Sequence, residues 1–150
     1  MHMYRRFTAM IATSTVVMLP LMYLNTYAAD HVFFSETRSY MALVMGAAMA
    51  LIMLAFMRGM LTNRRFNAVV VVAAIAVFAA ALWLVRSQET VDQVSYMKAM
   101  IPHHSIAILT SERAHISDPR VRRLADDIIE TQRREIAEMK SLISELEAAQ

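Results

Sequence analysis

The chain has 150 residues, no cysteine, 57% apolar residues and a formal net charge of +2. That length suits one compact unit, or a membrane part with a short domain, and the lack of cysteine excludes disulfides, cysteine-based zinc sites and thiol catalysis. The charge is uneven, because the first 85 residues hold six arginines and two acids whereas the rest hold nine basic and eleven acidic groups. The C-terminal part is therefore net acidic, which argues against a nucleic-acid-binding module.

Three uncharged stretches lie in the first 87 residues, at residues 7–29, 39–57 and 66–85. About 20 residues, rising 1.5 Å each along a helix, cross a hydrocarbon core of roughly 30 Å. An isolated span in lipid must satisfy its own backbone hydrogen bonds, so each stretch is expected to be helical. The sequence therefore predicts a transmembrane region over residues 1–87, with three spans and the lipid bilayer as its partner.

The first stretch has an alternative interpretation as a signal peptide. Two arginines precede it, and Thr26-Tyr27-Ala28 resembles a cleavage site. Its apolar run is longer than the roughly 7–15 residues of a signal peptide, which favours an uncleaved helix with a kink at Pro20. Both interpretations place residue 30 outside the cytoplasm, and His31 in that loop is expected to be solvated.

The arginines that flank the stretches predict the orientation. They precede the first stretch and separate the second from the third, at Arg5, Arg6, Arg58, Arg64 and Arg65. The loop at residues 28–38 instead holds two acids and one arginine. Because positive charge collects on the cytoplasmic side, we expect a cytoplasmic N-terminus, a bacterial inner-membrane location and a periplasmic domain at residues 88–150.

Residues 88–150 change to an amphipathic pattern. Thr90 and Gln93 have the spacing of a capping box, which predicts a helix from there to about Ala114. Asp118 as N-cap and Pro119 as first helical residue predict a second helix that runs to about Ala148. The expected fold is all-α, with a periplasmic αα-hairpin after three membrane helices.

One face of each predicted helix carries side chains that can bind a metal ion. The spacings i, i+3 and i+7 join Met97, Met100 and His104 in the first helix and Gln132, Glu135 and Met139 in the second. In an antiparallel hairpin that turns near residue 117, the two faces converge. Thioether and imidazole together suit Cu(I) or Ag(I), while Glu135 or Gln132 can orient an imidazole from the second shell.

Two motifs in this part resemble the domain-of-unknown-function family numbered 305, a ferritin-like helical family. They are Met100-Ile101-Pro102-His103-His104 and Gln132-Arg133-Arg134-Glu135-Ile136-Ala137-Glu138-Met139, within a resemblance that covers about residues 90–145. Some members resemble periplasmic copper-binding proteins with Met and His ligands, which implies a site built from Met97, Met100, His103, His104 and Met139. Members often continue with Gln and further Met residues, where this chain has Ser105 and Ile106, so a high-capacity site is not expected.

Other interpretations of these residues stay open. Methionines on apolar faces commonly fill a core, and this holds for the series Met41, Met45, Met49, Met53 and Met57 in the second stretch. Glu112 and His115 have the Glu-x-x-His spacing of di-iron bundles, but one copy is a weak indication of an enzyme.

The size of the hairpin predicts a partner. About 60 residues give too small a core for independent stability, so we expect a homo-oligomer, in which two hairpins form a four-helix bundle, or a second membrane protein. The main functional expectation is a membrane-anchored periplasmic protein that binds Cu(I) for tolerance or delivery. The alternative is a structural or interaction module that binds no metal.

Overall fold

A computed structural model describes residues 2–149, which form five α-helices and one 3-10 helix and contain no strand. The predicted all-α class is confirmed. The chain divides into two compact units, one of Met1–Met22 with Thr37–Thr90 and the other of Tyr23–Glu36 with Val91–Gln150. The sequence predicts a second domain of residues 88–150 alone, and in the structure the segment at residues 23–36 joins it.

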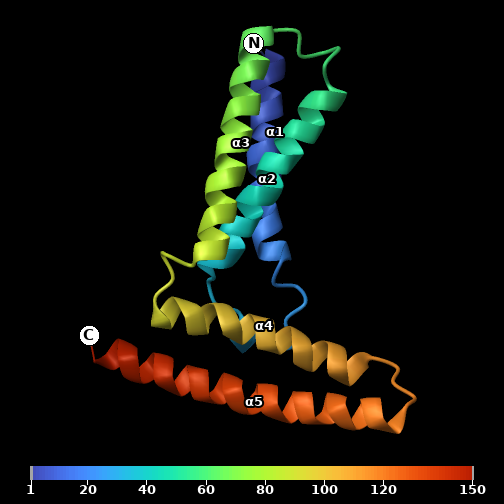
Figure 1. Ribbon diagram of the computed structural model, residues 1–150, viewed down its shortest axis with the longest axis vertical. Helices are drawn as coiled ribbons and strands as arrows, with labels where there is room; N and C mark the ends of the chain where they lie inside the picture. Colours follow the sequence, from blue (N-terminus) through green and yellow to red (C-terminus); the bar gives the residue numbers. More distant parts are fainter. Residues whose placement is uncertain (1, 150) are drawn as a thin grey trace. The chain divides into compact units, whose positions relative to one another are not determined.

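The first unit contains α1 (His2–Leu21), α2 (Glu36–Phe56) and α3 (Arg64–Ser87) (Figure 1). Of the helices in the described residues, α2 and α3 are long and apolar enough to cross a membrane. Asn63 begins α3, and its side chain accepts hydrogen bonds from the amides of Arg65 and Phe66. Gln88 ends α3 in the left-handed conformation with φ 55°.

Residues 7–29 do not form the single membrane-spanning helix that the sequence predicts. The helix α1 begins at His2, includes both N-terminal arginines and ends at Leu21, directly after Pro20. Proline removes a backbone donor and obstructs the preceding turn, so the last turn of α1 is weakened by Pro20. Residues 7–21 of the predicted span are helical, and α1 is not among the described helices that are long and apolar enough to cross a membrane.

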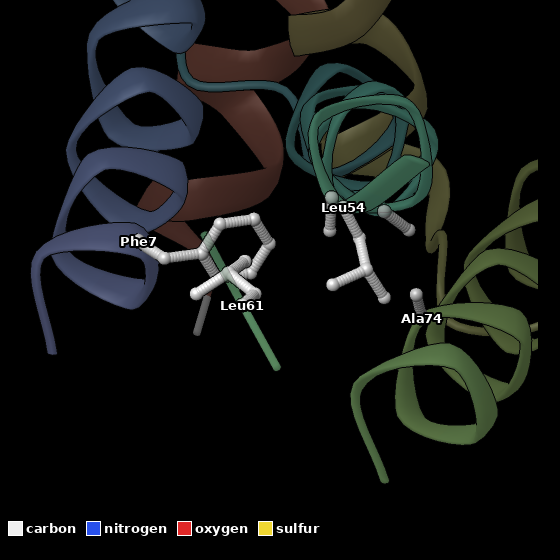
Figure 2. Packing of buried hydrophobic residues seen from close by; sticks show 6 residues of the cluster. Phe7, Leu54, Leu61 and Ala74 are labelled. Atoms are coloured by element: carbon white, nitrogen blue, oxygen red, sulfur yellow. The ribbon is translucent and has the colours of Figure 1, made fainter. Parts of the chain in front are cut away.

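A small apolar core holds the first unit together. Figure 2 shows Phe7 of α1 against Leu61 of the α2–α3 connection, with Leu54 of α2 facing Ala74 of α3. The Tyr4 hydroxyl lies 3.0 Å from Oδ1 of Asn67, so α1 and α3 begin at the same end of this unit. Buried small residues in α2, including Ala47 and Ala50, complete the core.

The second unit contains the antiparallel pair α4 (Gln93–Arg113) and α5 (Pro119–Ala148) (Figure 1). The predicted start of α5, with Asp118 as N-cap, and its end at Ala148 are confirmed. The predicted N-cap of α4 is wrong, because Asp92 accepts from the Ser95 amide instead. The hydroxyl of Thr90 lies 2.8 Å from that of Tyr40 and does not cap the helix.

The core of the second unit lies between α4 and α5. Its buried residues are Met97, Ile101, Ile108, Ile136 and Ile143, and Phe33 of the segment at residues 23–36 packs against them. That segment contains the 3-10 helix η1 (Ala29–His31), which contacts α4. The hairpin therefore gains core from a stretch of chain that lies before α2.

Candidate functional site

An open groove of about 700 Å³ runs between α4 and α5. We call it the α4–α5 groove. The residues that line it are Gln93, Tyr96, Met97, His104, Glu135, Glu138, Met139, Leu142 and Leu146. Four of the seven predicted site residues therefore meet in one groove, with two thioethers, one imidazole and one carboxylate among them.

His104 is the half-buried polar residue at the centre of this arrangement. Its Nδ1 lies 3.2 Å from Oε2 of Glu135, across the two helices. The distance is that of an ion pair, but the angle departs from hydrogen-bond geometry, and Nδ1 has no other partner in the described chain. Burial lowers the pKa of His104, Glu135 opposes this shift and His103 adds to it. The imidazole is therefore neutral near pH 7, which is the form that binds metal ions.

The two methionines of the groove also belong to the hydrophobic core. Met97 is 7% exposed and Met139 packs against the same cluster. Their thioethers need no deprotonation to act as ligands, so burial among apolar side chains does not disable them. Met139 lies one turn beyond Glu135 on α5, on the same face as the carboxylate that contacts His104.

Three predicted site residues do not line the groove. They are Met100, His103 and Gln132. His103 is exposed, and its ring centre lies 6.0 Å from that of His104. The adjacent histidines therefore differ in surroundings, because a helix turns by about 100° at each residue. Only His104 shares the groove with the methionines.

The segment at residues 23–36 binds another part of α4 through Ser105. The Ser105 side chain is fully buried, and its Oγ accepts a hydrogen bond of 2.7 Å from the Tyr27 amide. Nδ1 of His31 lies 2.9 Å from the same oxygen. The expectation that His31 is solvated is wrong, because this contact leaves its side chain 14% exposed.

Charged groups surround this docked segment. Lys140 of α5 lies 2.7 Å from Oδ2 of Asp30. Glu112 accepts hydrogen bonds from the Tyr27 hydroxyl and from Arg133, which also lies 5.9 Å from the centre of the Tyr27 ring. Glu112 is thus engaged in an ion pair, which does not favour a di-iron role for the Glu-x-x-His pair that it forms with His115.

A metal site made of His, Cys, Asp and Glu side chains is not found in the described part of the chain. Among residues 2–149 there is no group of three or more such side chains placed to hold a metal ion. Two thioethers and one imidazole line the α4–α5 groove, and these donor types bind soft ions such as Cu(I).

Sequence reasoning does not identify Ser105 and His31 as a pair. Ser105 follows the histidine pair and is noticed only as a missing ligand, and His31 stands alone in a short loop. The one signal in the sequence is a small polar residue on the apolar side of α4, flanked by Ile101 and Ile108, which are both buried. A buried hydroxyl requires a partner, but the pattern does not say which one.

Comparisons with known proteins agree with the family resemblance that the two motifs show. Residues 87–150 match the family described as Domain of unknown function (DUF305). "Uncharacterized protein L153" of Acanthamoeba polyphaga mimivirus is 33% identical over 108 residues, which cover 71% of this chain and 69% of that protein. The aligned stretch is longer than residues 87–150, so the similarity extends into the preceding helices. No solved structure matches the chain. By these two matches, the chain belongs to the DUF305 family.

Proposed function

We propose that the chain binds a soft metal ion, Cu(I), in the α4–α5 groove, with Met97, His104 and Met139 as donors. The observation that carries the proposal is the presence of two thioethers and one imidazole in the same groove. Thioether and imidazole ligands favour Cu(I) over hard cations such as Mg²⁺ and Ca²⁺. The family resemblance, in which some members resemble copper-binding proteins with Met and His ligands, points the same way.

Glu135 supports this chemistry as the residue that orients His104. In metal sites, a carboxylate that accepts a hydrogen bond from one ring nitrogen leaves the other nitrogen free for the ion. Here the contact of Glu135 with His104 has the distance of such a bond but not its angle. The 3.2 Å contact joins Nδ1 to Glu135, which leaves Nε2 as the nitrogen that would hold the ion. The carboxylate also supplies negative charge near a cation. This donor set is smaller than the predicted site, because it omits Met100, His103 and Gln132.

The proposal includes a membrane anchor made of α2 and α3, with α1, which begins at the same end as α3, packed against them. Both helices are long and apolar enough to cross a bilayer, and three arginines, Arg58, Arg64 and Arg65, lie in or beside the connection between them. The positive-inside rule places that connection in the cytoplasm. The second unit then lies on the other side, which is the periplasm if the membrane is a bacterial inner membrane. Copper tolerance or copper delivery at that surface is the role that fits.

A second candidate is a module that binds another protein and no metal. It is favoured by Met97, which is buried in the core cluster, and by Tyr96 and Leu142, which line the groove and are 54% and 41% exposed. An apolar groove of this kind accepts the apolar face of a helix. Under this hypothesis the partner is a second copy, in a ferritin-like four-helix bundle, or a different membrane protein.

An anaerobic titration of Cu(I) against a competing chelator tests the proposal on the full chain in detergent micelles. The double variant Met97→Leu/Met139→Leu removes both sulfurs with little change in volume. Met100→Leu is the matched control, because Met100 does not line the groove. We expect one Cu(I) per chain, affinity at least about tenfold weaker in the double variant, and no change in the control.

The same titration separates the two candidate functions. Equal affinity in the double variant and the control contradicts the groove as the binding site. Absence of Cu(I) binding in a folded wild-type chain contradicts the metal proposal altogether and favours the interaction module. Circular dichroism of each variant checks that the helices are intact.

A further inference from the structure

One end of the first unit carries positive charge without counterions. Arg5 and Arg6 lie in α1, Arg58 follows α2, and Arg64 and Arg65 begin α3, and all five are exposed. Within residues 2–149, no acidic side chain lies within ion-pair distance of any of them. The sequence contains no acid between Glu36 and Glu89 that could neutralise this end.

A hollow of about 690 Å³ opens at this end, and we call it the Arg5 hollow. Its lining residues come from the start of α1, the α2–α3 connection and the start of α3, and they are Tyr4, Arg5, Thr8, Ala9, Thr62, Asn63 and Phe66. The two helix starts are joined by a hydrogen bond of 2.8 Å from the Asn63 amide to the Tyr4 hydroxyl. The rings of Tyr4 and Phe66 lie 4.3 Å apart. These contacts hold together the two helix starts that line the hollow.

The donors that remain free in the hollow suit an anion. Oδ1 of Asn63 accepts hydrogen bonds of 3.1 Å from the amides of both Arg65 and Phe66, so the first amides of α3 are occupied. The Arg5 guanidinium then supplies the charge, and Thr8 and Thr62 supply hydroxyls. Arg5 also lines a neighbouring hollow with His2 and Arg6. A guanidinium binds a phosphate through two parallel hydrogen bonds.

We propose that the Arg5 hollow binds the phosphate group of an anionic phospholipid. The lining is partly apolar, because it includes Ala9, Phe66 and the Tyr4 ring, and free phosphate makes no favourable contact with apolar groups. Basic pockets at the cytoplasmic ends of membrane helices are suited to anionic headgroups, and an aromatic residue is favoured at that depth. The inference rests on the membrane placement proposed for α2 and α3, and not on metal binding.

Native mass spectrometry of the full chain in a neutral detergent tests this inference. The probes are phosphatidylglycerol and phosphatidylcholine with the same acyl chains, and millimolar inorganic phosphate serves as competitor. We expect the wild type to prefer phosphatidylglycerol. We expect Arg5→Gln to weaken that binding about fivefold, which corresponds to one basic residue near an anionic surface. Arg86→Gln, an exposed arginine at the other end of α3, is the matched control and is expected to leave binding unchanged.

Each alternative result contradicts the inference in its own way. Equal binding of the two lipids, or equal effects of the two variants, excludes a phosphate site at Arg5. Displacement of the lipid by inorganic phosphate, at a phosphate concentration equal to that of the lipid, identifies a site for free phosphate instead. Extraction of the chain from reconstituted vesicles by alkaline carbonate overturns the membrane placement itself. Retention of the chain without lipid preference overturns the lipid site alone.

Discussion

Nδ1 of His31 lies 2.9 Å from Oγ of Ser105, although the two residues are 74 positions apart in the chain. This contact fixes the segment at residues 23–36 on α4, one residue away from His104. The Tyr27 amide donates to the same oxygen, so a single buried hydroxyl serves two groups of the docked segment. Ser105 is therefore one of the residues that hold that segment on α4.

Replacement of Ser105 by alanine is expected to loosen the segment at residues 23–36. The variant leaves the Tyr27 amide and the His31 ring without their partner, and each buried unsatisfied group costs about 1–3 kcal/mol. Hydrogen exchange measured by mass spectrometry on the full chain should show faster exchange at residues 23–36 and in the middle of α4. The first unit should keep its protection.

Ser141→Ala is the matched control for that experiment. Ser141 is exposed on α5 and bonds only Glu145 of its own helix, so its loss is expected to change stability by about 0.5 kcal/mol or less. Unchanged exchange in Ser105→Ala, or equal changes in both variants, would show that the docked segment does not depend on Ser105.

The docking of residues 23–36 should weaken in acid. Burial lowers the pKa of His31 below its ordinary 6.5, Lys140 lowers it further, and Asp30 opposes both effects. The undocked state therefore binds more protons than the docked state just below pH 6.5, and docking loses free energy as the pH falls through that value. Protection of residues 23–36 against hydrogen exchange is expected to be greater at pH 7.5 than at pH 5.5, after correction for intrinsic rates.

His31→Gln tests the origin of this pH dependence. Glutamine can bond Ser105 and does not titrate between pH 5 and 8, so the variant should lose most of the difference between the two pH values. The pKa of His104 is also lowered, chiefly by burial, which is why the readout has to be local to residues 23–36. An equally steep pH dependence in the variant would assign the effect to another group.

A close approach of α1 and α2 makes Gly46 sensitive to substitution. A Cβ at Gly46 would lie 2.2 Å from Oγ1 of Thr15 and 3.1 Å from its methyl carbon. Gly46→Ala therefore forces α1 to move or Thr15 to turn, which breaks its 2.8 Å hydrogen bond to the Ile11 carbonyl. We expect a loss of about 1–3 kcal/mol, measured by unfolding of the full chain in detergent.

Gly59 provides the control for this prediction, because a Cβ there meets nothing within 4 Å. Gly59→Ala should leave the unfolding transition unchanged. The double variant Gly46→Ala/Thr15→Ala removes the clashing side chain and should recover most of the lost stability. A Gly46→Ala chain as stable as the wild type would mean that the two helices are not held as closely as described.

The helix ends of the hairpin were largely predictable, because local chemistry sets them. Asp118 and Pro119 define the start of α5 through a cap and a preset backbone angle. The predicted start of α4 is two residues too early, because the capping-box spacing favours Thr90, whereas Thr90 contacts Tyr40 and Asp92 caps the helix. A run of uncharged residues likewise does not reveal that α1 ends next to Pro20.

The candidate site was predictable only in part. Helical spacing correctly places His104, Glu135 and Met139 near one another, since the two helices are amphipathic and antiparallel. It also groups Met100 with them, although that residue does not line the groove, because spacing along one helix does not fix the rotation of that helix against its partner. The docked segment depends on contacts such as Asp30 with Lys140, 110 positions apart, which local patterns do not encode.

The most direct test of the metal proposal compares the two adjacent histidines. An anaerobic Cu(I) competition titration of the full chain is made on His104→Ala and His103→Ala beside the wild type. The groove contains His104 and not His103, so His104→Ala is expected to weaken Cu(I) binding at least about tenfold while His103→Ala stays close to the wild type. Equal losses in both variants, or a larger loss in His103→Ala, would contradict the assignment of the α4–α5 groove as the metal site.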